Sequence, residues 1–158
     1  MAGPLLKRAN AIVWLPPRGD GRTLPGAETM LAFVRGAGGA WSATRASLDV
    51  LAARKTVVLL VDVRDVTLLA PKLPPLTGPR LVRALPNIIE DMLLQDPAAC
   101  VLALGPPTGE GARLVAACDR AWLEGAVGAF ERRGMSVAAI WPAALTLPLA
   151  AGGADVVL

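Results

Sequence analysis

The amino-acid sequence predicts an α/β fold, a mixed sheet flanked by helices. The strongest observation is the run Thr56–Val61, an unbroken series of β-branched and leucine residues that is typical of a strand buried on both faces. A second is the segment 114–140, where the pattern changes from strand to helix and back to strand. The third is an apolar stripe at three- and four-residue spacings within residues 79–95. Alternating strands and helices are typical of a sheet covered by helices.

The first part of the chain is predicted to contain short strands and one helix. Residues 11–15 form an apolar run closed by Pro16-Pro17, and residues 29–34 form a second strand closed by a glycine-rich turn. A weak strand over 40–42 leads into a helix over 44–54, because Leu48 and Leu51 fall on one face. Another short strand, over 66–70, follows Thr56–Val61 after a polar break.

The helix expected over residues 79–95 has two different faces. Its apolar stripe consists of Leu81, Leu85, Ile88 or Ile89, and Met92. Pro86 lies within this stripe and cannot donate a backbone hydrogen bond, so we expect a kink or a second helix that begins there. The polar side chains that fall largely off the stripe are Arg80, Arg83, Asn87, Glu90 and Asp91. They form either a solvated face or a docking surface.

Residues 100–118 are expected to form a hairpin around a loop at 105–111. Symmetry about Gly109 would place Cys100 opposite Cys118, with Leu102 opposite Ala116 and Leu104 opposite Leu114. Both faces of this hairpin are apolar, which predicts helices on each side of it.

A helix capped by Asp119 follows the hairpin. Its apolar stripe consists of Leu123, Ala126, Val127 and Phe130, and Gly134 stands where a left-handed residue commonly ends a helix. A strand over 136–140 comes next.

The hydrophobic share of 54% raises the question of a membrane segment. Alanine accounts for much of it, with 29 residues. The longest uncharged stretch, 134–154, contains Pro142, Pro148 and Gly152-Gly153, which would break a helix repeatedly. Residues 1–10 lack the apolar segment of a signal peptide. We therefore expect a soluble chain with no membrane span.

Several kinds of active site are excluded by composition. The chain contains no histidine, which removes Ser-His-Asp and Cys-His nucleophile systems and imidazole acid–base chemistry. Cys100 and Cys118 are the only cysteines, too few for a zinc tetrahedron or an iron–sulfur cluster held by this chain alone. The net charge of +3 is spread thinly and does not call for nucleic acid as a partner.

The remaining candidates for chemistry are weak. The segment 105–111 resembles a phosphate loop in its glycines but lacks the Lys-Ser/Thr pair. Asp62 and Asp65 at a strand end could meet a metal ion, although charged turn residues are the commoner explanation. The two cysteines could form a redox switch, but their apolar surroundings favour packing. We expect no catalytic residues, no cofactor, no metal site and no enzymatic activity.

Two ordered blocks of sequence carry a family resemblance. The first is Arg80-Leu-Val-Arg-Ala-Leu-Pro-Asn-Ile-Ile-Glu-Asp, followed by Asp96. The second begins at Ala117-Cys-Asp-Arg-Ala-Trp-Leu, passes Gly134 and ends at Trp141-Pro-Ala-Ala-Leu-Thr-Leu-Pro. Both resemble the cytoplasmic domain of type II secretion system protein L, also called general secretion pathway protein L (GspL). The resemblance covers about residues 9–158 and is looser over the first 75. Asn87, Gln95 and Trp141 depart from the family pattern or vary within it.

The resemblance implies an actin-like, RNase H-like fold, related to that of pilus assembly protein M. It implies that residues 1–158 are the N-terminal part of the cytoplasmic domain of a longer protein, with a single membrane-spanning helix and a periplasmic domain beyond this chain. The expected location is the cytoplasmic face of the bacterial inner membrane. The implied role is a scaffold that recruits the secretion ATPase (protein E) and links it to protein M, and the implied state is a homodimer. No nucleic acid is expected as a partner.

The implied contact with the ATPase is placed on the polar face of residues 80–91: Arg80, Arg83, Asn87, Glu90 and Asp91. An alternative function is an actin-like nucleotide-binding ATPase that uses the loops at 20–23 and 105–111. Only the second function requires nucleotide binding, and an actin-like protein binds its nucleotide between two halves, of which this chain is expected to hold one.

Overall fold

The computed structural model describes residues 9–18, 29–109 and 111–146. The strands are β1 (Ala11–Trp14), β2 (Met30–Arg35), β3 (Trp41–Ala46), β4 (Thr56–Val61), β5 (Val66–Leu69), β6 (Cys100–Gly109), β7 (Ala112–Asp119) and β8 (Ser136–Pro142). The helices are α2 (Leu48–Leu51), α3 (Gly78–Ile89) and α4 (Arg120–Glu131), with the 3₁₀ turns η1 (Glu90–Met92), η2 (Pro97–Ala99) and η3 (Ala143–Thr146). The predicted α/β class with a mixed sheet is confirmed.

The larger sheet has five strands in the order β3-β2-β1-β4-β8. The pairs β3–β2 and β2–β1 are antiparallel, whereas β1–β4 and β4–β8 are parallel. Strand β4 lies between two neighbours, and every residue from Val57 to Val61 is buried, as its continuous apolar run predicts. The parallel strands β1, β4 and β8 end at the same edge of the sheet.

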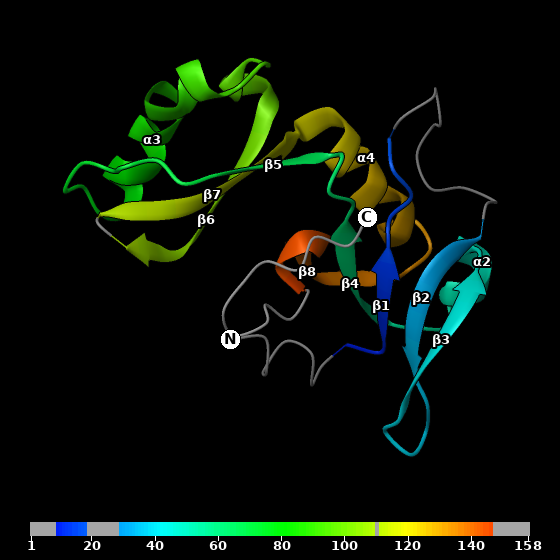
Figure 1. Cartoon of the computed structure of the whole chain (residues 1–158). Helices are drawn as coiled ribbons and strands as arrows, with labels where there is room; N and C mark the ends of the chain where they lie inside the picture. The colour runs from blue at the N-terminus through cyan, green and yellow to red at the C-terminus, as the bar shows by residue number, and fades with distance from the viewer. Residues whose placement is uncertain (1–8, 19–28, 110, 147–158) are drawn as a thin grey trace.

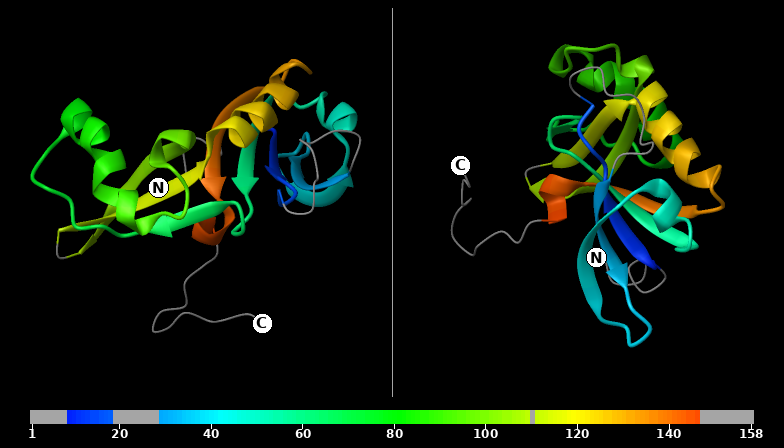
Figure 2. Two further views of the ribbon diagram at one scale, coloured as in Figure 1. Left: turned by 90° about the horizontal axis from the view of Figure 1, so that it is seen from above. Right: turned by 90° about the vertical axis from the view of Figure 1, so that its right-hand side faces the viewer.

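The smaller sheet has three antiparallel strands in the order β5-β7-β6. It is inserted in the chain between β4 and α4, and the two sheets lie beside each other in an elongated molecule (Figures 1 and 2). The segment 114–140 does form strand, helix and strand. However, β7 belongs to the smaller sheet and β8 to the larger one, so α4 connects two sheets.

Two hydrophobic cores correspond to the two sheets. The main core packs α4 and α2 against the larger sheet, and Phe130 of α4 is its largest fully buried side chain. Cys118 of the smaller sheet also joins this core. The second core is small: Leu85 and Ile89 of α3 pack against Val115 of β7 and its neighbours. The smaller sheet is therefore stabilised by a separate helix.

The predicted register of the β6–β7 hairpin is wrong by one residue. Cys100 lies opposite Asp119, and the partner of Cys118 is Val101. The turn is tighter than expected, because β6 continues to Gly109 and β7 begins at Ala112. This shift by one residue places Leu102 and Leu104 on the same face of the sheet as Val115, the face that α3 covers.

Helices cover less of the β6–β7 hairpin than its two apolar faces predict. Most of the described residues of β6 after Cys100 are half-buried or exposed, and Ala103 is exposed. Helix α3 covers one face of the smaller sheet, and α4 reaches only its beginning, through Cys118, Val66 and Val101. Small residues such as alanine can remain near the surface at little cost, so an apolar strand does not require a cover on each side.

Two predicted helices have different bounds from those expected. The helix predicted over 44–54 is only Leu48–Leu51, because residues up to Ala46 belong to edge strand β3. The helix predicted over 79–95 ends at Ile89 and continues as the 3₁₀ turn η1. Pro86 lies inside α3 without starting a new helix.

The strand after α4 agrees with the prediction and extends to Pro142. Among the described residues, no helix combines the length and the apolar character needed to cross a bilayer.

Candidate functional site: a polar helix face and the junction of two sheets

Helix α3 exposes the polar face that the sequence predicts. Its buried side consists of Leu81, Leu85 and Ile89, of which Leu85 and Ile89 belong to the second core. The side chains proposed for docking are all exposed: Arg80, Arg83, Asn87, Glu90 and Asp91. At 3.6 residues per turn, the first three share one side of α3, and Glu90 and Asp91 follow in η1. The structure therefore exposes all five residues, and their role in docking stays a prediction.

Large apolar side chains beside this face were missed by sequence reasoning. Met92, expected in the buried stripe, is 46% exposed, because α3 changes to a 3₁₀ turn at Glu90 and the stripe no longer follows helical spacing. Leu94 is fully exposed, and Val82 is 60% exposed. Exposed apolar side chains next to charges are common features of protein interfaces. In the sequence, the three-residue apolar run Met92-Leu93-Leu94 is the feature that could have indicated these exposed side chains.

The charges of α3 are opposite to those that its dipole favours. Arg80 lies in the first turn, whereas Glu90 and Asp91 follow the last residue. Acidic side chains stabilise a helix at its N-terminus and basic ones at its C-terminus. The described helix has neither an acidic residue in its first turn nor a basic one in its last. These charges therefore do not contribute to the stability of α3.

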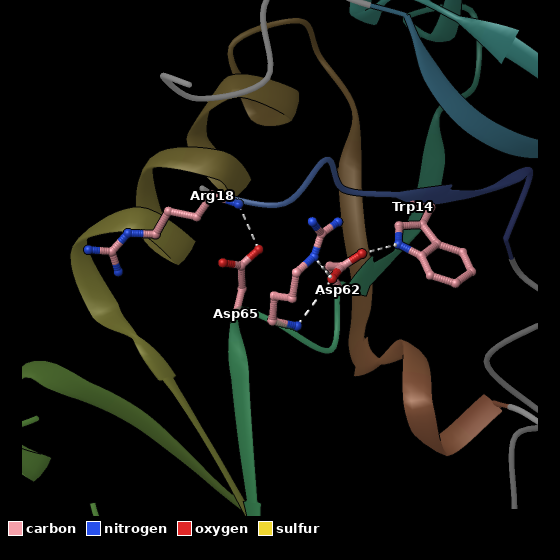
Figure 3. Close-up of polar contacts among 5 residues, drawn as sticks. Trp14, Arg18, Asp62 and Asp65 are labelled. Carbon is pink, nitrogen blue, oxygen red and sulfur yellow. Dashed lines mark hydrogen bonds and ion pairs between the residues drawn. The ribbon is translucent and has the colours of Figure 1, made fainter. Parts of the chain in front are cut away.

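A second polar cluster lies at the junction of the two sheets (Figure 3). Asp62, directly after β4, accepts a hydrogen bond of 3.3 Å from the indole nitrogen of Trp14 at the end of β1. It also accepts bonds from the backbone nitrogen and Nε of Arg64, at 3.1 and 2.9 Å. Burial alone would raise the pKa of Asp62, but the bonds from Arg64 and Trp14 outweigh it and lower that pKa.

Arg18 connects the segment after β1 to the smaller sheet. Its backbone nitrogen donates to Asp65 at 2.8 Å, and its guanidinium pairs with Asp119 at 2.8 Å. Asp119 caps α4, because it accepts a 2.8 Å bond from the backbone nitrogen of Trp122. This bond, assisted by Arg18, lowers the pKa of Asp119. The cavity beside these residues has a volume of about 690 Å³ and is bordered by Met92, Leu93 and Leu94 of the segment after α3.

Neither carboxylate at the end of β4 is arranged as a metal ligand. Asp62 is bound to Arg64 and Trp14, and Asp65 accepts a bond from Arg18. Within residues 9–18, 29–109 and 111–146, no three His, Cys, Asp or Glu side chains are grouped so that they could hold a metal ion. The interpretation of these aspartates as structural turn residues is therefore favoured.

The residues proposed for nucleotide binding are only partly described. The loop at 20–23 lies outside the described residues. The glycine-rich segment that begins at Gly105 belongs mainly to β6 and ends at the hairpin tip, at the far end of the smaller sheet from β1 (Figure 1). It begins no helix, so no helix N-terminus there points at a phosphate.

The cysteines lie on opposite faces of the smaller sheet. Cys100 is paired with Asp119 and Cys118 with Val101, and successive residues of a strand point to opposite faces. Both thiols are free and buried. Burial raises the pKa of Cys118 to about 11, with a further contribution from Asp65 and Asp119, and burial raises that of Cys100 as well. Both features favour packing over redox chemistry.

Known structures resemble this fold. The cytoplasmic domain of EpsL, an inner membrane component of the type II secretion system of Vibrio cholerae, superposes with a TM-score of 0.71 and 20% identity, over 87% of this chain and 58% of that one. A PilM–PilN type IV pilus biogenesis complex superposes with a TM-score of 0.59 and 15% identity, over 84% of this chain and 46% of that one. The predicted actin-like fold is confirmed by these likenesses.

Sequence comparison identifies the family. The type II secretion system protein L of Vibrio cholerae serotype O1 is 28% identical over 125 residues, which are 77% of this chain and 30% of that protein. This chain thus spans about a third of the length of that relative. Residues 32–157 match the sequence profile of the family described as type II secretion system (T2SS), protein L. Because this match covers most of the sequence, the chain belongs to the type II secretion system protein L family.

Proposed function

We propose that this chain is an adaptor domain at the cytoplasmic face of the bacterial inner membrane, which recruits the secretion ATPase (protein E) and links it to protein M. Membership of the protein L family supports this role. The EpsL relative is described as an inner membrane component with a cytoplasmic domain, and the PilM-like fold occurs in a complex with another protein. We propose that the chain acts through protein contacts, without catalysis of its own.

The observation that carries the proposal is the exposed side of α3 and η1. It combines charged side chains with exposed Met92 and Leu94, whereas Asp62, Asp65 and Asp119 at the sheet junction already bind other parts of the same chain. Charges that do not stabilise their own helix remain available for a partner. We therefore place the contact with the ATPase on Arg80, Arg83, Asn87, Glu90 and Asp91.

Isothermal titration calorimetry with the N-terminal region of the ATPase tests the proposal. The unmodified chain is expected to form a measurable complex. The double variant Glu90→Lys/Asp91→Lys should bind about tenfold more weakly, because two exposed ion pairs worth roughly 0.2–1 kcal/mol each become repulsive. The matched control is Glu124→Lys/Glu131→Lys, which makes the same change of charge on exposed positions of α4.

Two results would contradict the proposal at different levels. Unchanged affinity of the α3 variant, with a complex still present, would remove this face and leave the adaptor role. Absence of any complex would remove the adaptor role itself. ATP hydrolysis by the purified chain would favour the alternative of an actin-like ATPase; under the proposed role we expect none.

A further inference from the structure

Strand β3 forms an open edge of the larger sheet. It pairs with β2 over all six of its residues without a register shift, and no described strand pairs with its other side. Every residue from Trp41 to Arg45 is exposed. Figure 1 shows this edge at the end of the molecule away from the smaller sheet and α3. The edge is therefore a surface separate from the face proposed for the ATPase.

The hydrogen bonds of β2 show which backbone groups of this edge are free. The backbone nitrogen of Gly36, directly after β2, donates to Ala40 at 2.8 Å, whereas that of Arg35 donates to Asn10 at 2.9 Å. Because the direction alternates along a strand, the even-numbered residues of β2 bond to β3 and the odd-numbered ones to β1. The backbone groups of β3 that point outward, without a partner among the described residues, belong to Trp41, Ala43 and Arg45.

In the part of the chain that the structure describes, the other sheet edges carry features that discourage strand addition. Strand β8 ends at Pro142 and pairs with β4 through a register shift. Strand β6 contains Pro106 and Pro107, and β5 has only four residues. Prolines, bulges and short strands are means by which proteins protect a sheet edge. Strand β3 contains neither proline nor glycine, and such an edge is suited to receive a strand from a partner.

The side chains of β3 indicate which kind of strand fits. Ala46 belongs to the main core, on the face covered by α2 and α4. Since side chains alternate along a strand, the odd-numbered ones point to the opposite face. There Phe33 of β2 lies opposite Ala43, and Trp41 is 39% exposed. Apolar residues at alternate positions of an added strand would extend this apolar surface.

Arg45 gives the added strand a charge preference. Arg35 and Arg45 are the only charged residues within 30–46, and both are basic. No acidic side chain of the described segments pairs with Arg45. A hollow of about 330 Å³, lined by Trp14 and Leu31 among others, leaves room for a side chain beside its guanidinium. A carboxylate directly opposite Arg45 would form a cross-strand ion pair there.

We propose that β3 receives an extended segment of a partner protein as a sixth, antiparallel strand of the larger sheet. The segment carries an acidic residue opposite Arg45 and apolar residues opposite Ala43 and Trp41. Antiparallel pairing is the more stable arrangement per residue. The outward backbone groups supply the hydrogen bonds, and the alternate side chains supply the selectivity. This inference goes beyond the adaptor role and does not depend on it.

A synthetic peptide with this pattern, Glu-Thr-Val-Thr-Phe with blocked ends, tests the proposal by amide-detected NMR of the unmodified chain. Before the peptide is added, the amides of Trp41, Ala43 and Arg45 should exchange rapidly with solvent, whereas those of Ser42 and Thr44 should be protected by β2. The peptide, at concentrations up to about 1 mM, should shift the signals of the three outward amides and slow their exchange.

Methyl groups on the peptide backbone test the direction of pairing. In the proposed strand, the N–H groups of the glutamate, valine and phenylalanine point toward β3, and those of the two threonines point away. N-methylation of the valine should weaken binding at least about tenfold, because it removes a hydrogen bond and places a methyl group between the strands. N-methylation of the threonine after it is the matched control and should change binding by less than about twofold.

Two variants of the chain test the contact from the other side. Ala43→Pro removes an N–H that the pairing with β2 does not use, so it should abolish binding and leave the melting temperature nearly unchanged. Arg45→Glu should weaken binding about tenfold and should prefer a peptide with lysine in place of glutamate. The control Arg132→Glu makes the same change of charge on an exposed position after α4 and should bind normally.

Several results would overturn the proposal. One is the absence of any shift in β3 with the peptide. Another is protection of the three outward amides before the peptide is added, because the edge would then already be covered by another part of this chain or by a second copy. Equal effects of the two methylations, or normal binding by a folded Ala43→Pro, would also contradict it. If Ala43→Pro does not fold, the methylated peptides still decide the question. None of these measurements contains the ATPase, so their result is independent of the proposed function.

Discussion

Asp62 shows how one buried carboxylate stabilises the edge of a sheet. Its side chain is 11% exposed and accepts bonds from Trp14 on one side and Arg64 on the other. A carboxylate without partners at this depth would lose hydration without compensation. The sequence places Asp62 at a strand end and permits either a metal ligand or a turn residue. The choice depends on Trp14, which is 48 residues away in sequence.

The variant Asp62→Asn should lower the free energy of unfolding at pH 7 by about 1.5–3 kcal/mol, the typical contribution of hydrogen bonds to a charged group. The pKa of Asp62 lies below its ordinary value of 3.8 in the folded state. Its contribution is therefore present above that value and is lost as the pH falls through the folded-state pKa. Urea unfolding of both proteins between pH 7 and pH 3 should show the difference between the two stabilities beginning to narrow as the pH falls below 3.8. A constant difference across this range would contradict the role of the charge.

The one-residue shift of the β6–β7 register predicts that Cys100 and Cys118 do not form a disulfide. Their side chains point to opposite faces, and a thiol with a pKa of about 11 reacts slowly. Treatment of the folded chain with diamide should leave both thiols free in a thiol assay. In the background Cys100→Ser, the change Val101→Cys places a thiol directly opposite Cys118, and this variant should form the bond. A Cys100–Cys118 bond in the folded, unmodified chain would contradict the register.

At the scale of elements, the sequence identifies those with strong local signals. The run Thr56–Val61 and the capped helix after Asp119 are where they are expected, because burial and a cap determine each of them locally. The register of the β6–β7 hairpin and the end of α3 depend instead on packing between distant segments. Leu102 and Leu104 face α3 because that helix covers this side of the sheet, which no spacing within 100–118 indicates.

Gly134 ends α4 in the left-handed conformation, with φ of +75°. The variant Gly134→Ala should reduce stability by about 1 kcal/mol, because a Cβ makes this conformation unfavourable although no neighbouring atom lies within 4 Å. Thermal unfolding followed by circular dichroism measures the change. The control Gly38→Ala also has open space around its Cβ but lacks positive φ, and should leave the melting temperature unchanged or slightly higher. Equal effects of the two substitutions would contradict the conformational explanation.

At the scale of the whole molecule, the protein has two cores of unequal size. The main core contains most of the fully buried residues, whereas the smaller one depends on Leu85, Ile89 and Val115. The sequence predicts the α/β class but not the division into two sheets, since α4 separates two strands as it would in a single sheet. The polar face of α3 could be predicted from helical spacing. The exposed Met92 and Leu94 could not, because the helix ends earlier than its pattern indicates.

The unequal cores predict that the smaller sheet opens first. The variant Ile89→Ala should increase hydrogen exchange in α3 and β6, with a local cost of about 2–5 kcal/mol. All four tryptophans lie in β1, β3, α4 and β8, outside the smaller sheet, so the fluorescence transition in urea should barely move. The control Phe130→Ala should shift that transition by about 3–5 kcal/mol. Equal shifts for both variants would mean that the two sheets unfold as one unit.

The path of the chain through the smaller sheet begins and ends at one place. It leaves the larger sheet after β4, and Val66 at the start of β5 pairs with Cys118 near the end of β7. Arg18 contacts both Asp65, just before β5, and Asp119, at the end of β7. The segment between β4 and α4, which forms the smaller sheet and α3, therefore begins and ends at neighbouring positions. The length, surface and binding properties of this segment can change during evolution while the strand order of the larger sheet stays the same. A short linker between its two ends would join β4 directly to α4 and leave the larger sheet connected without it.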